Sequence, residues 1–248
     1  MIDRVEVVRG GGSALFGASA IGGTINIITK EPTRNSAEVG HSFMSIGGKN
    51  SFDNATSANV SLVTDDNKAG FYAYGQNRYR QAFDYDEDGY SELPVIHNQT
   101  FGVNSFLRLS PYSKLTAQYH GIQEFRRGGN MLDRVAHEAN IAEQVEHNIQ
   151  GGGVSFDYIS PNEKNRLNTY FSFQTTARKS YYGGIGEGSP EDKEAAQKAY
   201  GTTHDFTHVL GAQYIHSFEK LLFMPSDLTL GAEYNYDGLK DIIVGYDR

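Results

Sequence analysis

Apolar and polar residues alternate with a period of two along most of the chain from residue 37 onwards. The alternation is clearest in the segments SKLTAQYHGIQEF (113–125) and DLTLGAEYNYD (227–237). In the second segment, Leu230 and Tyr234 fall on the apolar side and Glu233 falls on the polar side. Strict alternation predicts strands whose two faces meet different surroundings.

The predicted strands are long, and the breaks between them alternate in length. Each strand spans roughly 10 to 15 residues, about twice the usual length. The breaks comprise short polar turns at 64–70, 110–114 and 160–165, a longer apolar turn at 219–227, long segments at 84–98, 127–144 and 183–203, and one tight exception at 47–50. Long amphipathic strands joined alternately by short turns and long loops are typical of outer-membrane β-barrels. We count about nine such strands, the last from Asp227 to Ile243, whereas a barrel made of one chain has an even number.

Composition narrows the class of protein further. Aromatic residues make up 12% of the chain, and 28 residues are glycine, although only 38% are hydrophobic. No stretch approaches the ~18 uninterrupted apolar residues of a membrane-spanning helix. The net charge of -8 argues against a nucleic acid as partner, and the lack of cysteine excludes disulfides and thiolate metal sites. A soluble β-sandwich is the alternative, but sandwich turns recur about every 8–12 residues.

The most specific pattern is RVEVVRGGGSALFGASAIGGTINIITK, residues 4–30. It resembles the end of the plug domain of TonB-dependent outer-membrane receptors, which reads R-G-P-x-S-x-x-Y-G, then a small-residue run, then G-G-x-I-N-I-x-T. The matching positions are Arg9, Gly10, Ser13, Gly17, Gly22, Gly23, Ile25, Asn26, Ile27 and Thr29. Gly11 stands where proline is usual, and Phe16 stands where tyrosine is usual. A nucleotide-binding loop is disfavoured, because no long helix follows and there is no G-K-[ST] sequence.

The resemblance implies an all-β fold. We expect a partial transmembrane antiparallel β-barrel, about nine of ~22 strands, with the C-terminal part of an α+β plug domain. The expected division is 1–33 for the plug part and 34–248 for the first part of the barrel. The opening sequence MIDRVEVVRG lacks the apolar core of a signal peptide. We therefore expect the signal peptide, the energy-coupling segment, the rest of the plug and the closing strands to lie outside this sequence.

The implied function is TonB-dependent uptake of a scarce, bulky nutrient, a ferric siderophore or cobalamin, across the bacterial outer membrane. The implied partners are the TonB–ExbB–ExbD complex, the small-molecule ligand and outer-membrane lipid, and no cofactor is required. Haem is an alternative substrate, although the histidines of the long loops lack a ligand spacing: His137, His147, His204 and His208. An enzyme is disfavoured because no G-x-S-x-G sequence is present, and a passive porin is disfavoured because it has no plug.

The acidic segment DYDEDGYSE is a candidate metal site. Asp84, Asp86 and Asp88 match the first half of a calcium-binding EF-hand loop, but Val95 stands where the bidentate glutamate is required. The cobalamin receptor of the same family binds calcium in extracellular loops, so a bound Ca²⁺ ion is one interpretation. The other is a solvated acidic loop.

Two residue pairs near the predicted loops are candidate ligand contacts. Arg126 and Arg127 lie where the polar lumen would meet the outside, and guanidinium groups hold anions through two parallel hydrogen bonds. The alternative is pairing with carboxylates of the loops. Tyr181 and Tyr182 lie at the mouth of another loop, where they would either stack on a planar ligand or belong to the aromatic belt at the membrane interface.

Charged residues of the plug part are candidates for holding it in the barrel. Glu6 and Arg9 flank the first predicted strand. The resemblance implies that such charges pair with charges of the barrel wall. Glu233, on the polar side of the last strand, is the candidate partner of Arg9, and a buried pair of this kind acts as a switchable latch.

Overall fold

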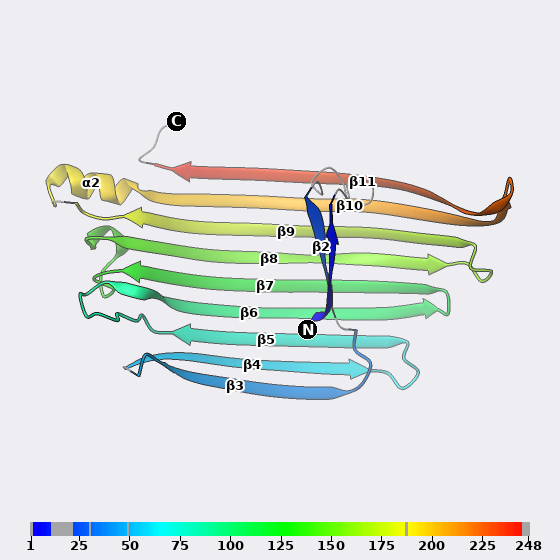
Figure 1. Ribbon diagram of the computed structural model, residues 1–248, viewed down its shortest axis with the longest axis horizontal. Coiled ribbons are helices and arrows are strands. Elements are labelled where there is room, and N and C mark those ends of the chain that lie inside the picture. The colour runs from blue at the N-terminus through cyan, green and yellow to red at the C-terminus, as the bar shows by residue number, and fades with distance from the viewer. Residues whose placement is uncertain (1, 11–21, 30, 49, 187, 245–248) are drawn as a thin grey trace.

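The computed structural model describes residues 2–10, 22–29, 31–48, 50–186 and 188–244, and most of them lie in one antiparallel sheet (Figure 1). Its nine strands follow one another in sequence order, each paired with the next. They are β3 (Ser36–Ile46), β4 (Ser51–Val63), β5 (Ala69–Arg80), β6 (Ser91–Ser110), β7 (Ser113–Gly129), β8 (Ala142–Ile159), β9 (Asn165–Gly183), β10 (Tyr200–Leu221) and β11 (Met224–Ile243). The predicted number of strands and their antiparallel order are confirmed.

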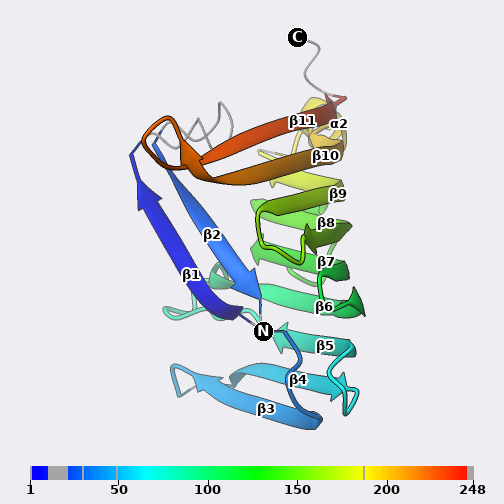
Figure 2. The same cartoon turned by 90° about the vertical axis from the view of Figure 1, so that its right-hand side faces the viewer.

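A second, two-stranded sheet precedes the large one. Strands β1 (Ile2–Arg9) and β2 (Gly23–Thr29) pair antiparallel, and this hairpin lies beside one face of the large sheet (Figure 2). Thr29, at the end of β2, accepts a hydrogen bond from the side chain of Asn104 in β6, with 3.4 Å between Nδ2 and Oγ1. We call the face that carries Asn104 the inner face and the opposite face the outer face.

The two faces differ in polarity as the alternation predicts. The register places Gln118 of β7 beside Asn104, so both belong to the inner face. Four residues of adjacent strands form one row of the outer face, and each is between 42% and 58% exposed: Val154, Phe171, Leu210 and Tyr234. Large apolar side chains left open in this way require apolar surroundings, which lipid supplies to the outside of a barrel. No helix in the described part of the chain is both long and apolar enough to cross a membrane.

The connections follow the predicted alternation, with one correction. Short turns join β4 to β5, β6 to β7 and β8 to β9 at one end of the sheet, and the long connections lie at the opposite end (Figure 1). The predicted apolar turn at 219–227 is wrong, because only Leu222 and Phe223 separate β10 from β11. Pairing continues past Phe218, which lies opposite Ser226, so backbone hydrogen bonding extends the strands through an apolar stretch.

Helical structure occurs within two of the long connections. The 3-10 helix η1 (Ala136–Glu138) lies between β7 and β8, and helix α2 (Pro190–Lys198) lies between β9 and β10. Ser189 is the N-cap residue of α2. Its hydroxyl accepts a hydrogen bond from the backbone N–H of Asp192, and the Asp192 carboxylate accepts one from the backbone N–H of Ser189. This reciprocal cap satisfies two N–H groups at the helix start.

Gly129, at the end of β7, is expected to be intolerant of any side chain. Its φ is 96°, and an added Cβ would lie 2.2 Å from the carbonyl oxygen of Ile141. The backbone conformation alone costs a non-glycine residue about 1–3 kcal/mol. We expect Gly129→Ala to accelerate proteolysis of segment 130–141, and Gly75→Ala, which meets no atom closer than 3.8 Å, to leave it unchanged. Equal proteolysis of both variants would contradict this account of the junction.

Asp66, in the turn between β4 and β5, is expected to give that turn a pH-dependent stability. Hydrogen bonds from the side chain of Lys68, and next from the hydroxyl of Thr64, lower the pKa of the Asp66 carboxyl from 3.8 to about 2. A lowered pKa stabilises the folded state above pH 3.8, and this stabilisation is lost as the pH falls toward 2. Asp66→Asn should therefore slightly lower the unfolding temperature at pH 7 and not at pH 2. Asp65→Asn is the matched control, and a deficit of Asp66→Asn that persisted at pH 2 would refute the assignment.

Candidate ligand-binding surface

A row of polar side chains crosses the inner face near its loop end. Each member lies opposite the next in the register of the sheet, so the row runs across the strands from β5 to β11. Its members are Arg78, Asn98, Glu124, His147, Arg178, Thr203 and Asp241. We call these seven residues the polar row. Adjacent strands lie about 4.8 Å apart, so neighbouring side chains of the row are within hydrogen-bonding reach.

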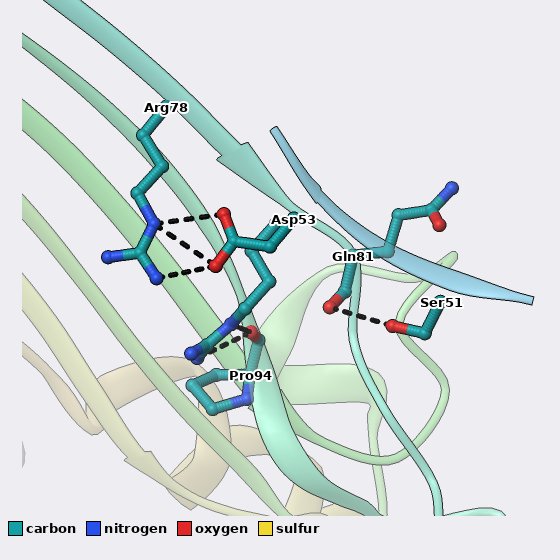
Figure 3. Close-up of polar contacts among 6 residues, drawn as sticks. Ser51, Asp53, Arg78, Gln81 and Pro94 are labelled. Carbon is teal, nitrogen blue, oxygen red and sulfur yellow. Dashed lines mark hydrogen bonds and ion pairs between the residues drawn. The ribbon is translucent and has the colours of Figure 1, made fainter. Parts of the chain in front are cut away.

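At the β4–β5 end of the polar row, Arg78 holds Asp53 through parallel hydrogen bonds (Figure 3). The guanidinium Nε lies 2.9 Å from Oδ1 of Asp53, and Nη2 lies 2.5 Å from Oδ2. Arg80 differs, because its Nε and Nη2 both donate to the carbonyl oxygen of Pro94, at 3.2 and 3.1 Å. Among the described residues, no carboxylate forms an ion pair with Arg80. The Arg80 guanidinium is therefore held by a backbone carbonyl and not by a paired carboxylate.

Glu124, near the middle of the polar row, contacts two neighbouring side chains. Its carboxylate accepts from the side-chain amide of Asn98 at 2.9 Å and pairs with Nε of Arg126 at 2.7 Å. The side chain of Arg126 is 54% exposed, whereas that of Glu124 is 17% exposed. Arg126 and Arg80 belong to the same register row, two strands apart, which separates them by roughly 10 Å.

At the far end, Thr203 links an arginine to a carboxylate. Nε of Arg178 donates to the Thr203 hydroxyl at 3.2 Å, and that hydroxyl donates to Asp241 at 2.5 Å. Nη2 of Arg178 also lies 3.9 Å from the Asp241 carboxylate. The polar row therefore alternates guanidinium and carboxylate groups, which suits a ligand with anionic groups and hydrogen-bond donors.

The period of two divides each predicted residue pair between the faces. Arg126 and Tyr182 lie on the inner face, where Tyr182 is 76% exposed. Arg127 and Tyr181 lie on the outer face and are 3% and 2% exposed. Arg127 and Tyr181 are therefore corrected from ligand contacts to structural residues, because neither can reach a molecule in the lumen.

Tyr181 belongs to a small core that joins two long loops. Its other buried members are Ala136, Ala139 and Ala142, and Met131, Ala199 and Tyr200 pack against it. We include the buried Arg127, whose guanidinium donates to the carbonyl oxygens of Gly128 and Asn130 at the start of the first loop. The backbone N–H of Ile185 donates to the carbonyl oxygen of Ala139 at 3.0 Å and ties the loops together. We call this set of residues the loop core. It holds the two loops in place above the end of the sheet that carries the polar row.

The acidic segment brings its carboxylates together. Asp84, Asp86, Asp88 and Glu92 each place a ligand oxygen within 4.8 Å of the others. Asp84 also accepts from the backbone N–H groups of Glu87 and Gly89, at 2.7 and 2.9 Å. Glu92, which does not belong to the predicted triad, lies near the start of β6 and accepts from the N–H of Tyr85 at 2.5 Å. The cluster has the donor set of a hard-cation site, and its carboxylates also order the loop backbone directly.

The Gly-rich motif begins in β1 and ends in β2, and its residues 11–21, which include the matching positions Ser13 and Gly17, lie outside the described residues. Arg9 ends β1, Gly10 has a φ of 91°, and Gly22 precedes β2. Gly23 begins β2 with a φ of 137°, and a Cβ there would lie 2.7 Å from the carbonyl oxygen of Val8. Asn26 donates to Glu6 across the hairpin at 3.3 Å. Gly23 is therefore required for close pairing of β1 with β2.

The predicted pairing of Glu6, Arg9 and Glu233 is not present in this structure. Glu6 pairs with Arg4, with 2.8 Å between Nε and Oε1, inside the hairpin. Glu233 accepts a hydrogen bond from Tyr170, and no ion pair joins the described residues Arg9 and Glu233. Instead, Lys114 of β7 pairs with Glu31, just after β2. The physical reason is that both carboxylates have other partners: Glu6 accepts from Arg4 and Asn26, and Glu233 accepts from Tyr170.

The four histidines considered for haem do not converge. His147 belongs to the inner face, whereas His204 and His208 belong to the outer face. His137 lies in η1, where its Nδ1 is 3.1 Å from the hydroxyl of Tyr200. Histidines on opposite faces of one sheet cannot ligate a common iron atom.

Known proteins resemble this chain both in sequence and in structure, although no family model matches it. The vitamin B12 transporter BtuB of Photobacterium profundum is 30% identical over 127 residues, which is 48% of this chain and 19% of that protein. The siderophore receptor PirA of Pseudomonas aeruginosa has a TM-score of 0.67 at 16% identity, covering 97% of this chain and 36% of that one. The ferripyoverdine receptor of the outer membrane of Pseudomonas aeruginosa has a TM-score of 0.70 at 17% identity, covering 98% and 33%.

These similarities establish the fold. Two solved receptors share it over almost the whole of this chain, and the chain spans about a third of their length. The related sequence is named as a transporter and the solved structures are named as receptors. The resemblance read from the Gly-rich motif is therefore confirmed at the level of the fold, and the apolar outer face has the character that contact with lipid requires.

Proposed function

We propose that this chain, whose fold is that of TonB-dependent outer-membrane receptors, takes part in active uptake of a scarce, bulky nutrient. The observation that carries the proposal is the polar row, which lies on the same face as the β1–β2 hairpin and directly below the long loops. In the proposed complete receptor, residues 1–33 end the plug and residues 34–248 begin the barrel. Ligand bound at the loop end would then pass the plug toward the periplasm. The proposal involves no covalent chemistry.

A ferric siderophore or cobalamin is the proposed substrate class. The names of the similar proteins, a vitamin B12 transporter and receptors for siderophores, favour these two classes. The guanidinium of Arg80, which has no carboxylate partner among the described residues, and the exposed Arg126 suit the anionic groups that such ligands carry. Haem is the weaker candidate, because the histidines do not converge.

The proposed energy source is the TonB–ExbB–ExbD complex of the inner membrane. This proposal rests on the resemblance of residues 4–30 to the end of a plug domain. The pair between Lys114 and Glu31 and the hydrogen bond between Asn104 and Thr29 connect this segment to the barrel wall. A pull on the plug would have to break these contacts first.

A calcium ion at Asp84, Asp86, Asp88 and Glu92 is a further proposal within this function. The four ligand oxygens lie close enough to share one cation, and the loop borders the polar row through β5 and β6. Chelation, or Asp86→Ala, would then lower affinity for the transported ligand. Affinity unchanged by both treatments would identify the cluster as a backbone-ordering element only.

Removing the exposed inner-face side chains is expected to weaken ligand binding without unfolding the barrel. We expect Arg126→Ala to lower affinity for an anionic ferric siderophore about tenfold, because one charge-assisted contact is lost. Tyr182→Ala should have a similar effect if its exposed ring stacks on the ligand. The measurement is equilibrium binding of ferric siderophores and of cobalamin to the complete receptor. Arg108→Ala, on the inner face at the opposite end of β6, is the control, and an equal loss in that variant would contradict the placement of the site.

A further inference from the structure

Two rings of the inner face lie over glycines of the neighbouring strands. Tyr74 lies opposite Gly102, and His120 lies opposite Gly151. A Cβ added at Gly102 would lie 2.5 Å from the ring of Tyr74, and one added at Gly151 would lie 2.8 Å from the imidazole of His120. Each ring therefore occupies the space above a glycine and stays close to the wall. Gly151 follows His147 of the polar row by four residues along β8, so it lies about 13 Å further from the loops.

A trough of about 240 Å³ lies between β7 and β10 at this height. Residues 151–153 of β8, which cross the trough, are all glycine, so no side chain of that strand fills it. Gly152 and Gly153 also allow close strand pairing, because an added Cβ would lie 2.6 and 2.8 Å from a carbonyl oxygen of the next strand. Glycines inside a strand often mark a place where a ligand approaches the backbone. The inner-face residues that line the trough are Gln118, His120, Ser172, Gln174, Thr207 and Val209.

The trough offers hydrogen bonds without charge. The described residues that line it include no Asp, Glu, Lys or Arg. Within the described part of the chain, the side chains of Gln118, Ser172 and Gln174 form no hydrogen bond, whereas the hydroxyl of Thr207 donates to Asp237 at 3.3 Å. Amide and hydroxyl groups both donate and accept. The trough therefore suits an uncharged part of a ligand, whereas the polar row suits an anionic part.

The trough lies next to the contact between the β1–β2 hairpin and the wall. Asn104, which donates to Thr29 at the end of β2, lies directly opposite Gln118. A second cavity of about 110 Å³ shares Gln118 and His120 with the trough and extends to Thr29. A group held in the trough is therefore at the edge of the hairpin, on the side toward β10.

We propose that the trough is a second ligand-binding site, which holds an uncharged ring or chain bearing hydroxyl or amide groups while the ligand passes the hairpin. Gln118 and Gln174 bind these groups from opposite sides, and the glycines of β8 let the ligand approach the backbone. The inference rests on the proposed uptake function and adds to it a place on the wall that the ligand occupies after it leaves the polar row.

The experiment measures uptake and binding separately for the complete receptor in cells, with cobalamin and a ferric hydroxamate siderophore as probes. Ser172→Leu fills the trough, and the double variant Gln118→Leu with Gln174→Leu removes its amide groups with little change in volume. We expect each to lower the initial rate of energy-dependent uptake about tenfold, because the passing ligand loses one or two hydrogen bonds. Equilibrium binding to cells whose energy supply is blocked should stay unchanged, because the polar row is intact.

The matched controls are Ser57→Leu and Gln76→Leu, which are the same substitutions at exposed inner-face positions outside the trough. Folding is checked by the heat-dependent shift of barrel proteins on gels. The double variant changes only exposed residues and serves as the test if Ser172→Leu does not fold.

The inference is overturned if the trough variants take up the probe as fast as the wild type does, or if the controls are slowed equally. It is also overturned if the trough variants lose binding as much as uptake, because the trough would then belong to the loop-end site. Absence of energy-dependent uptake of both probes by the wild type would instead overturn the proposed function, and this inference with it.

Discussion

Replacing Arg127 with alanine is expected to loosen both long loops while leaving the strands intact. The residue is 3% exposed, and its guanidinium donates to the carbonyl oxygens of Gly128 and Asn130, the latter at 3.3 Å. Its loss leaves these carbonyls without that donor and opens space beside Tyr181. We expect this change to lower the free energy of opening the loops by about 2–3 kcal/mol. The open state should then be populated roughly 30- to 150-fold more.

The measurement for Arg127→Ala is hydrogen exchange of segments 130–141 and 184–199. Arg126→Ala is the matched control: it removes the neighbouring guanidinium, which is 54% exposed, and should leave exchange unchanged. Tyr181→Phe supplies a second control. The Tyr181 hydroxyl is buried and has no hydrogen-bond partner in the described part of the chain, so its removal should be neutral or stabilising. Faster exchange in Arg126→Ala than in Arg127→Ala would reverse the assignment of the two arginines.

The contrast between Arg126 and Arg127 also shows that the sequence predicts the orientation of side chains along a strand better than the position where the strand ends. Alternation predicts that adjacent residues of a strand face opposite sides, and this rule alone separates the two arginines. The sequence does not reveal that the strand continues as far as Gly129, because long loops and strand ends have similar polar compositions. With β7 extended through the pair, one arginine enters the lumen and the other enters the loop core.

The polar row was missed for a related reason. Arg78, Arg178 and Asp241 each fall on the polar side of a predicted strand, so their orientation could be predicted. Their alignment depends on the register of successive hairpins, which is set by the backbone geometry of turns such as Thr64–Ala69. A similar limit explains why Arg9 and Glu233 are not paired. A suitable pair of charges can be found in the sequence, but the sequence does not show that Glu6 has Arg4 as a partner or that Glu233 has Tyr170.

The ion pair of Asp53 and Arg78 is expected to stabilise the fold. Its carboxylate should also offset part of the positive charge of the polar row. Asp53 is the more enclosed partner, with 12% of its side chain exposed against 38% for Arg78. In a double-mutant cycle with Asp53→Asn and Arg78→Gln, we expect a coupling energy of about 1–2 kcal/mol, reduced from that of a buried pair because Arg78 is partly solvated. Urea unfolding in lipid vesicles measures it, and additive single effects would exclude the coupling.

The two single variants should differ in ligand binding although both lower stability. Asp53→Asn leaves Arg78, Arg80 and Arg126 with less compensating negative charge, so affinity for an anionic ligand should rise a few-fold at low salt and the gain should vanish at about 0.5–1 M salt. Arg78→Gln removes positive charge from the same surface and should lower both stability and affinity. A common direction of affinity change in the two variants would mean that the ligand does not sense this pair. Opposite directions would place the anionic part of the ligand at the β4–β5 end of the polar row, beside the guanidinium of Arg80.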